Sequence, residues 1–441
     1  GCAAGSLRLR FLKTASPKSR PGLAAREAAI DHLSAVLEKG RMFDGVHAAG
    51  SPAERAEARA LADLVLRRLG QIDALIEEFV QRQPKGRGLQ LLRLMTAELV
   101  FHGTPAHAAV DNCVRLARAT KGTSRLAGLI NAVGRRLAER GAGLAADQDA
   151  ETLCMPKWLA KRLTADWGQK ATRAIAAAHL APPPHDLTLA QATDAAVLAT
   201  ELRAELLPTG SLRLPDRPQI SALPGYDQGA WWVQDAAAAL PVRLLGDVRD
   251  AKVLDLCAAP GGKTLQLATA GARVLAVDLS EPRAERLAQN LDRTGLDARM
   301  DVADVMEWEP PEVPDAIVLD APCSATGTIR RHPDLAHRTD GRGLQALVDL
   351  QARMLDRAYS WLRPGGRLVF CTCSLMKAEG EDQLSAILAR SGDAEVVAAD
   401  PEALGVPRSW VSPEGALRTR PDYWQERGGL DGFFAVCLRK Q

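Results

Sequence analysis

The chain has 441 residues, of which 46% are hydrophobic and 25% charged, and this suits a globular protein of two or three domains. It has no run of about 18 apolar residues and no apolar core of a signal peptide near its start, so we expect no membrane association and a cytoplasmic location. The net charge is +2, yet residues 1–150 carry 23 Lys and Arg against 15 Asp and Glu. This basic front part indicates a polyanion partner, or a solvated helix surface.

Most of residues 1–150 is predicted to form one helical domain, residues 21–140. We interpret residues 1–20 as a basic flexible arm, residues 21–140 as an all-α domain and residues 141–150, which are small and polar, as a linker. Ser51 and Pro52 are predicted to begin one of the helices. The expected helices are 24–38, 53–69, 72–81, 89–101, 105–119 and 124–140.

The rest of the chain changes from helical to mixed periodicity. Residues 151–245 are predicted to form an α/β subdomain, which opens with a basic helical segment whose side chains could face phosphate. In residues 246–441, short apolar runs alternate with helical segments, which predicts a Rossmann-like α/β domain with a mostly parallel sheet. The expected strands are 252–256, 272–277, 298–302, 316–319 and 367–371, and the expected helices are 263–270, 282–294 and 344–362.

A glycine-rich turn follows the first of these strands, as Cys257-Ala-Ala-Pro-Gly-Gly-Lys263. Glycines let backbone N–H groups approach a nucleotide at a helix N-terminus, although an ordinary strand–helix loop has the same composition. The next strand ends in Asp278, whose carboxylate can accept both hydroxyls of a ribose or, alternatively, cap the next helix. Asp304 follows the third strand and is placed to hydrogen-bond an adenine, unless it is a loop carboxylate.

Two further strands end in cysteines. The fourth leads into Asp320-Ala-Pro-Cys323 and the fifth into Cys371-Thr-Cys373. If these strands are neighbours, Cys323 and Cys373 face one pocket. Alternatively, a single buried cysteine is usually a small core residue. The four thiolates of Cys257, Cys323, Cys371 and Cys373 would suit zinc, but zinc sites usually have tighter pairwise spacing of their cysteines in the sequence. We therefore expect no metal, and all eight cysteines to be free thiols.

Two thiols and a carboxyl beside a nucleotide site suit chemistry on a pyrimidine. Carbon 5 of a pyrimidine is a poor nucleophile until a thiolate adds to carbon 6, after which carbon 5 can attack an electrophilic methyl group. A proton must then leave carbon 5 and the thiol must be expelled, which a second thiol can assist. A carboxyl can hydrogen-bond the ring and stabilise the charge that develops.

These motifs resemble the signature loops of the Sun/Fmu-type RNA cytosine-5 methyltransferases. The resemblance covers roughly residues 151–441, and the helical domain before it is similar to NusB-like RNA-binding domains. It is carried by Asp255-Leu-Cys-Ala-Ala-Pro-Gly-Gly-Lys263, Asp320-Ala-Pro-Cys-Ser324 and Thr372-Cys-Ser374, together with Trp232-Val-Gln-Asp235, Gly327-Thr-Ile-Arg-Arg-His-Pro-Asp334, Leu362-Arg-Pro-Gly-Gly366 and Asp431-Gly-Phe-Phe434.

The resemblance implies methylation of cytosine C5 in small-subunit (16S) ribosomal RNA, with S-adenosylmethionine as cofactor. It implies that Cys373 is the nucleophile, that Cys323 assists release, and that Asp320 lies near both base and cofactor. It implies RNA contacts for Arg330, Arg331 and His332. The implied cofactor-binding residues are Cys257, Ala258, Ala259, Pro260, Gly261, Gly262, Lys263, Asp278, Asp304 and Asp320.

One segment departs from the family pattern, and several alternatives stay open. Family members often carry Glu-Asn after the Thr-Cys-Ser loop, where this chain has Glu379-Gly-Glu-Asp382, so we assign that segment no role. DNA cytosine methyltransferases are the nearest chemical rival, and they are expected to place the nucleophile at Cys323. The alternative substrate is another RNA such as tRNA, and the alternative to an enzyme is a non-catalytic RNA-binding assembly factor. We expect a monomer.

Overall fold

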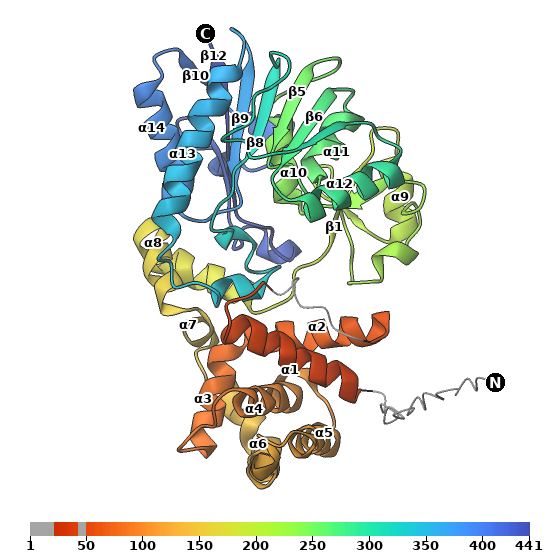
Figure 1. Ribbon diagram of the computed structural model, residues 1–441, viewed down its shortest axis with the longest axis vertical. Coiled ribbons are helices and arrows are strands. Elements are labelled where there is room, and N and C mark those ends of the chain that lie inside the picture. Colours follow the sequence, from red (N-terminus) through yellow and green to blue (C-terminus); the bar gives the residue numbers. More distant parts are fainter. Residues whose placement is uncertain (1–21, 43–49) are drawn as a thin grey trace, which may run out of the picture. The chain divides into compact units, whose positions relative to one another are not determined.

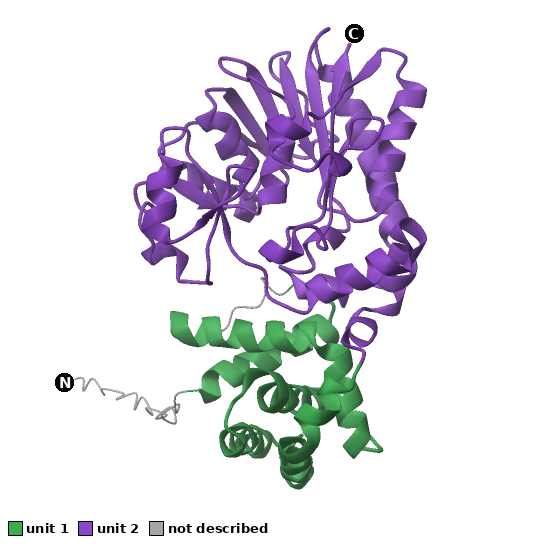
Figure 2. Cartoon of the chain, turned by 180° about the vertical axis from the view of Figure 1, so that it is seen from behind, with its two compact units in different colours: residues 1–148 green, residues 149–441 purple. Residues whose placement is uncertain are grey.

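The computed structural model describes residues 22–42 and 50–441, which fall into two compact units, residues 1–148 and 149–441 (Figure 2). The arm predicted at residues 1–20 lies outside the described residues. Among the described residues, no helix has the length and apolar character needed to cross a membrane. Each unit is described by itself below.

The first unit is all-helical in the part that the structure describes, as its periodicity predicts. Leucine, isoleucine and valine side chains from its helices share one core, with Ile30, Leu61 and Ile72 among its buried members. The predicted start at Ser51 is confirmed by a capping box, because its hydroxyl accepts from Glu54 N at 3.3 Å and its own N–H donates to the Glu54 carboxylate at 2.8 Å. The helices are α1 (Leu23–Leu37), α2 (Pro52–Arg67), α3 (Leu69–Phe79), α4 (Arg87–Ala97), the π-helical turn η2 (Glu98–His102), α5 (Ala106–Ala119), the 3₁₀ turn η3 (Ser124–Leu126) and α6 (Ala127–Ala146).

The linker predicted at residues 141–150 is wrong over most of its length, because α6 continues through Ala146. Gly141 is buried in this helix, and a Cβ there would come within 2.8 Å of Val100. The glycine therefore serves close packing of α6, where composition alone indicates a loop. The two units meet in sequence at residues 148 and 149.

The second unit begins with two helices and a small sheet. Helix α8 (Lys157–His179) bends at Gly168, whose φ of 79° lies in the left-handed region. A core of leucines and Trp231 lies within the small sheet and α9. The elements are α7 (Ala150–Cys154), β1 (Asp186–Leu189), α9 (Ala195–Leu202), β2 (Glu205–Leu206), β3 (Leu212–Arg213) and β4 (Trp231–Val233), with strand order β2-β3-β1-β4.

The large sheet of the second unit contains all five predicted strands, in the order β10-β12-β9-β8-β5-β6-β7 (Figure 1). The five run parallel, as their alternation with helices predicts. Three antiparallel strands, β10, β11 and β12, were not predicted from the sequence. The strands are β5 (Lys252–Leu256), β6 (Arg273–Asp278), β7 (Arg299–Val302), β8 (Ala316–Asp320), β9 (Arg367–Thr372), β10 (Ala394–Val397), β11 (Leu417–Thr419) and β12 (Phe433–Lys440).

Helices cover both faces of this sheet. Helices α10 (Ala236–Arg243), α11 (Gly262–Thr269) and α12 (Glu281–Thr294) pack on one face, and α13 (Leu344–Trp361) and α14 (Glu381–Arg390) on the other. The domain boundary predicted at 245/246 is therefore too late, because Ala237 and Leu240 of α10 share a core with Val253 of β5 and Val369 of β9. The remaining short helices are α15 (Pro401–Leu404), η4 (Ile220–Ala222), η5 (Thr326–Thr328), η6 (Pro333–Ala336), η7 (Lys377–Glu379), η8 (Arg408–Trp410) and η9 (Gln425–Arg427).

Candidate active site

The predicted site residues lie along one edge of the large sheet. Strands β9, β8, β5, β6 and β7 are consecutive neighbours and parallel, so their carboxyl ends meet at the same edge. In that spatial order the edge carries Cys373, then Asp320 with Cys323, then the glycine-rich turn, then Asp278 and finally Asp304. Open α/β sheets bind ligands at this edge.

The two thiols meet as the sequence predicts for neighbouring strands. Asp320 of β8 and Cys371 of β9 are register partners near the ends of their strands. Cys323 lies three residues after Asp320 and Cys373 two residues after Cys371, and their Sγ atoms are 3.5 Å apart. The hydrogen bond to Cys373 raises the pKa of the Cys323 thiol well above its usual value, and burial raises it further. Cys323 therefore keeps its proton and can donate it toward Cys373.

Lys263 connects the glycine-rich turn to the thiol region. Its Nζ lies 2.7 Å from Asp320 Oδ2 and its ammonium lies 5.4 Å from the centre of the Phe433 ring. Burial opposes the charge of Lys263, but the Asp320 carboxylate outweighs this and raises the lysine's pKa. The other oxygen of Asp320 accepts from the Cys371 thiol at 3.6 Å. The ion pair thus holds the Asp320 side chain between the glycine-rich turn and the two thiols.

The glycine-rich turn has the backbone that its sequence predicts. Gly261 has a φ of 110°, and a Cβ there would come within 2.2 Å of Leu287, so a side chain does not fit. Helix α11 begins at the next residue, which turns its first N–H groups toward the strand ends. Cys257 also has a positive φ, of 61°, and the Ala259–Pro260 peptide is cis.

The far end of the edge combines carboxylates with exposed apolar side chains. Asp278 accepts from Ala259 N and Ser280 N, both at 3.0 Å, which fixes its carboxylate beside the turn. Leu279 comes directly after β6 and is 71% exposed, and Val302 is the last residue of β7 and is 53% exposed. Exposed apolar side chains beside a carboxylate suit a ligand with a flat base and a ribose, such as adenosine. Sequence reasoning missed these two residues, because a lone Leu or Val carries no signal.

Asp255, in the middle of β5, is a buried carboxyl under this edge. Burial raises its pKa to about 7, although Thr264 Oγ1 donates to it at 2.5 Å. Its other oxygen has no hydrogen-bond partner and the residue is 0% exposed. Asp255 therefore links β5 to α11 and does not face a ligand.

The prediction that Arg330 contacts RNA is wrong, because its side chain is buried. Its guanidinium donates to Asp235 at 2.9 Å, to Asp431 at 2.8 Å and to the Gly428 carbonyl at 2.8 Å, and the residue is 2% exposed. Arg331 pairs with the same two carboxylates at 2.6 and 3.2 Å. We call Asp235, Arg330, Arg331 and Asp431 the buried ion network. The network joins three segments that are distant in the sequence. The local sequence Ile329-Arg-Arg-His332 therefore indicates an exposed basic loop, because it does not contain the two aspartates.

Three residues outside the predicted set support the thiol loops. Trp167 on α8 donates to the Leu375 carbonyl at 2.8 Å, just after Cys373. Glu379, on η7, is 0% exposed and accepts hydrogen bonds from the loops of both thiols. Gly380 follows it, and a Cβ there would come within 2.6 Å of Phe434. The glycine thus allows close packing beside the buried Glu379 carboxylate.

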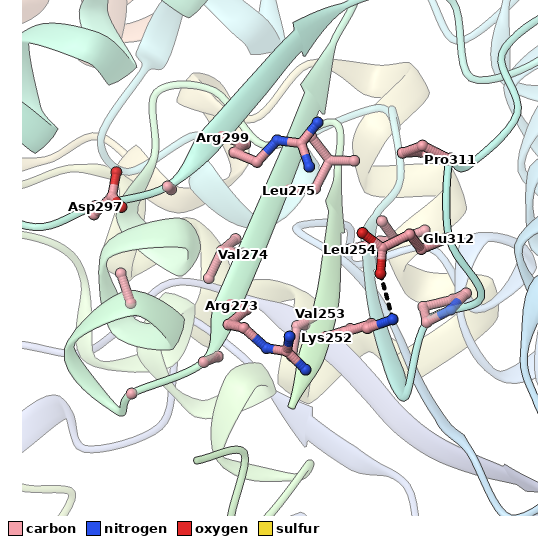
Figure 3. A pocket seen from close by; sticks show the side chains of 15 residues that line it. Lys252, Val253, Leu254, Arg273, Val274, Leu275, Asp297, Arg299, Pro311 and Glu312 are labelled. Atoms are coloured by element: carbon pink, nitrogen blue, oxygen red, sulfur yellow. Dashed lines mark ion pairs between the residues drawn. The ribbon is translucent and has the colours of Figure 1, made fainter. Parts of the chain in front are cut away.

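A separate pocket of about 470 Å³ lies at the opposite edge of the sheet (Figure 3). Lys252, Arg273 and Arg299 line it, and they are the first residues of β5, β6 and β7. Lys252 forms an ion pair with Glu312 across it. Because the pocket lies at the amino ends of these strands, it holds none of the predicted site residues. Elsewhere in residues 22–42 and 50–441, no three His, Cys, Asp or Glu side chains group as metal ligands would.

A Rossmann-like sheet with this turn and these carboxylates at one edge is typical of enzymes that bind a nucleotide-type cofactor, and the comparisons give the class as methyltransferases. The model of the family "16S rRNA methyltransferase RsmB/F" matches residues 242–439, and that of the NusB family matches residues 23–139. Ribosomal RNA small subunit methyltransferase B of Xanthomonas campestris pv. campestris is 34% identical over 97% of this chain and 99% of its own. The chain therefore belongs to the 16S rRNA methyltransferase RsmB/F family.

Solved structures agree in fold. A protein named PH0851 superposes with a TM-score of 0.72 and 21% identity, covering 96% of this chain and 100% of its own. A methyltransferase homologue from Pyrococcus horikoshii has a TM-score of 0.54 and 28% identity, over 64% of this chain and 94% of its own. The first of these likenesses spans both units, so the helical and the Rossmann-like parts occur together in a known fold.

Proposed function

We propose that the protein methylates carbon 5 of a cytosine in small-subunit ribosomal RNA through a covalent adduct with Cys373. The observation that carries the proposal is the 3.5 Å approach of Cys373 Sγ and Cys323 Sγ beside Asp320. A scaffold has no use for such a pair. The name of the matched family and that of the Xanthomonas relative support ribosomal RNA of the small subunit as substrate.

The side chains suit each step of the reaction. The Cys373 thiolate adds to C6, forming an S–C6 bond and moving the electron pair of the C5–C6 double bond toward C5. C5 then forms a bond to the methyl carbon, whose bond to the sulfur of the methyl donor would break with its electron pair remaining on that sulfur. A proton leaves C5 and the electron pair of that bond re-forms the double bond as the S–C6 bond breaks, which returns Cys373 as thiolate. Cys323, which holds a proton 3.5 Å away, stabilises the departing sulfur by hydrogen bonding.

Asp320 and Lys263 are placed to handle the charge of the ring. The Asp320 carboxylate can accept from the exocyclic amine of cytosine, which orients the base. The Lys263 ammonium, at 2.7 Å from Asp320, compensates the negative charge that forms in the ring on thiolate addition. Both groups are preorganised by their ion pair, so neither must reorganise during the reaction.

S-adenosylmethionine, when bound, supplies the electrophilic methyl group. We propose that the glycine-rich turn holds its methionine part, that Asp278 accepts from the ribose, and that Leu279 and Val302 pack on the adenine beside Asp304. The exposed apolar side chains at these strand ends support this fit. The target cytosine must leave its stack to reach the thiols, as expected for an enzyme that works on a base.

The experiment is to map 5-methylcytosine in ribosomal RNA from cells with and without the protein, and to assay transfer of labelled methyl to isolated rRNA and tRNA. We expect one cytosine of small-subunit rRNA to lose its methyl group without the protein. Label in tRNA alone would show that tRNA, and not ribosomal RNA, is the substrate. Cofactor binding without label in any RNA pool would favour a non-catalytic assembly factor.

A further inference from the structure

We propose that Glu379 is a positioning residue that holds the loops of Cys323 and Cys373 at their reactive spacing, an inference that rests on the function proposed above. Glu379 lies on η7, six residues after Cys373, and its carboxylate accepts its hydrogen bonds from Ser324, Ser374 and Gln351 and not from either sulfur. It acts on the residues that directly follow each cysteine. We call Glu379 with its donors Ser324, Ser374 and Gln351 the Glu379 clamp.

One buried carboxylate receives four hydrogen bonds in the clamp. Glu379 Oε1 accepts from Ser324 N at 2.8 Å and from Gln351 Nε2 at 3.0 Å. Glu379 Oε2 accepts from Ser324 Oγ at 2.5 Å and from Ser374 Oγ. An ionised carboxylate has about four acceptor positions and no donor, so this set of donors saturates it. The residue after each cysteine is thereby tied to the same group.

Further hydrogen bonds make the clamp continuous with both loops. Thr372, just before Cys373, donates its hydroxyl to the Glu379 carbonyl at 3.0 Å. Gln351 donates to the Pro322 carbonyl at 2.9 Å, just before Cys323. Each cysteine is therefore held on both sides by groups that the Glu379 residue or its partner Gln351 contacts. Such support from neighbouring residues is what fixes a reactive pair within a fraction of an ångström.

The charge of Glu379 also favours the protonation state that the mechanism needs. After the hydrogen bond to Cys373, burial and the charge of Cys373, the charge of Glu379 is a further cause of the raised pKa of Cys323. A buried charge with four donors is costly to place, and replacing it by an apolar group would leave those donors unpaired. The clamp thus serves both the geometry of the two thiols and the proton on Cys323.

The test compares Glu379→Gln with Asp382→Asn, a matched acid-to-amide change at an exposed position three residues away. The glutamine side chain keeps the size of the glutamate but presents N–H donors to a site that is already full of donors. We expect kcat for RNA methylation to fall about 100-fold, as for a misplacement of about 1 Å, with KM for RNA and for S-adenosylmethionine within about twofold of wild type. Asp382→Asn should match wild type.

A second readout reports the spacing of the sulfurs without catalysis. Diamide-driven formation of the Cys323–Cys373 disulfide, measured by mass spectrometry, should be about tenfold slower in Glu379→Gln, because disulfide closure needs a specific geometry. Should Glu379→Gln fail to fold, Ser324→Ala removes one donor and should lower both rates in the same direction. Wild-type kcat and disulfide rate in either folded variant would overturn the inference. If wild type forms no 5-methylcytosine, the proposed function fails, and the disulfide rate still tests the clamp.

Discussion

Replacing Arg330 by methionine separates a structural role from an RNA-binding one. The change removes three hydrogen bonds and leaves the buried carboxylates of Asp235 and Asp431 with Arg331 as their cation. Removing one partner from a buried ion pair costs about 3–5 kcal/mol. At about 2–3 °C per kcal/mol for a unit of this size, we expect the Tm of the second unit to fall by about 6–15 °C.

The assay is thermal unfolding followed by circular dichroism, together with RNA binding as a function of salt concentration. Arg342→Met is the control, because its side chain is 90% exposed and pairs only with an exposed aspartate, and its unfolding free energy should stay within about 0.5 kcal/mol of wild type. For folded Arg330→Met we expect the slope of log affinity against log salt to be unchanged. An unchanged Tm with a slope reduced by about one would refute this reasoning and restore Arg330 as a phosphate contact.

Three further changes follow from the site. Gly327→Ala should lower both the Tm and the methylation rate, because the new Cβ would come within 1.9 Å of the Gly432 carbonyl. In a urea titration we expect the free energy of unfolding to fall by at least about 2 kcal/mol. Wild-type stability would contradict the packing described here. Lys263→Met should reduce kcat by about 100-fold while the protein stays folded, because Asp320 loses its ion-pair partner and the cytosine ring loses its compensating charge. An unchanged rate in single-turnover assays would show that Lys263 takes no part in the reaction. Asp255 should contribute a loss of stability as pH rises from about 4 to about 7, because its folded pKa of about 7 lies above its unfolded value and the folded state holds this proton in that window. In chemical denaturation, Asp255→Asn should therefore lose less stability than wild type over this range, and parallel profiles would argue against a raised pKa.

The part of the site that is formed by residues close together in the sequence could be predicted from the sequence. Strand β5, the turn to Gly261 and helix α11 follow from an apolar run, glycines and a helical segment that adjoin one another. The meeting of Cys323 and Cys373 also follows, because the alternation of strands with helices makes β8 and β9 parallel and their ends adjacent. Parallel order converts spacing in the sequence into proximity in space.

Features that depend on distant partners could not be predicted in this way. From the local sequence Arg330 is predicted to be an exposed cation, because its partners Asp235 and Asp431 lie 95 and 101 residues away in the chain. Strand β12 has no helix crossover before it and pairs antiparallel with β9, so the βαβ pattern gives it no signal. Glu379 depends on nearby Ser374 and on two distant partners, Ser324 and Gln351, which lie 55 and 28 residues away in the sequence.

The central claim is that Cys373 attacks the cytosine and Cys323 assists its release, and trapping the covalent adduct tests it most directly. Purified Cys373→Ala and Cys323→Ala proteins are incubated with small-subunit rRNA and S-adenosylmethionine, and protein–RNA adducts are measured by denaturing electrophoresis and mass spectrometry. We predict an accumulating adduct through Cys373 in the Cys323→Ala protein, and neither adduct nor turnover in the Cys373→Ala protein. An adduct through Cys323 in the Cys373→Ala protein, with none in the other, would contradict the account and reverse the two roles.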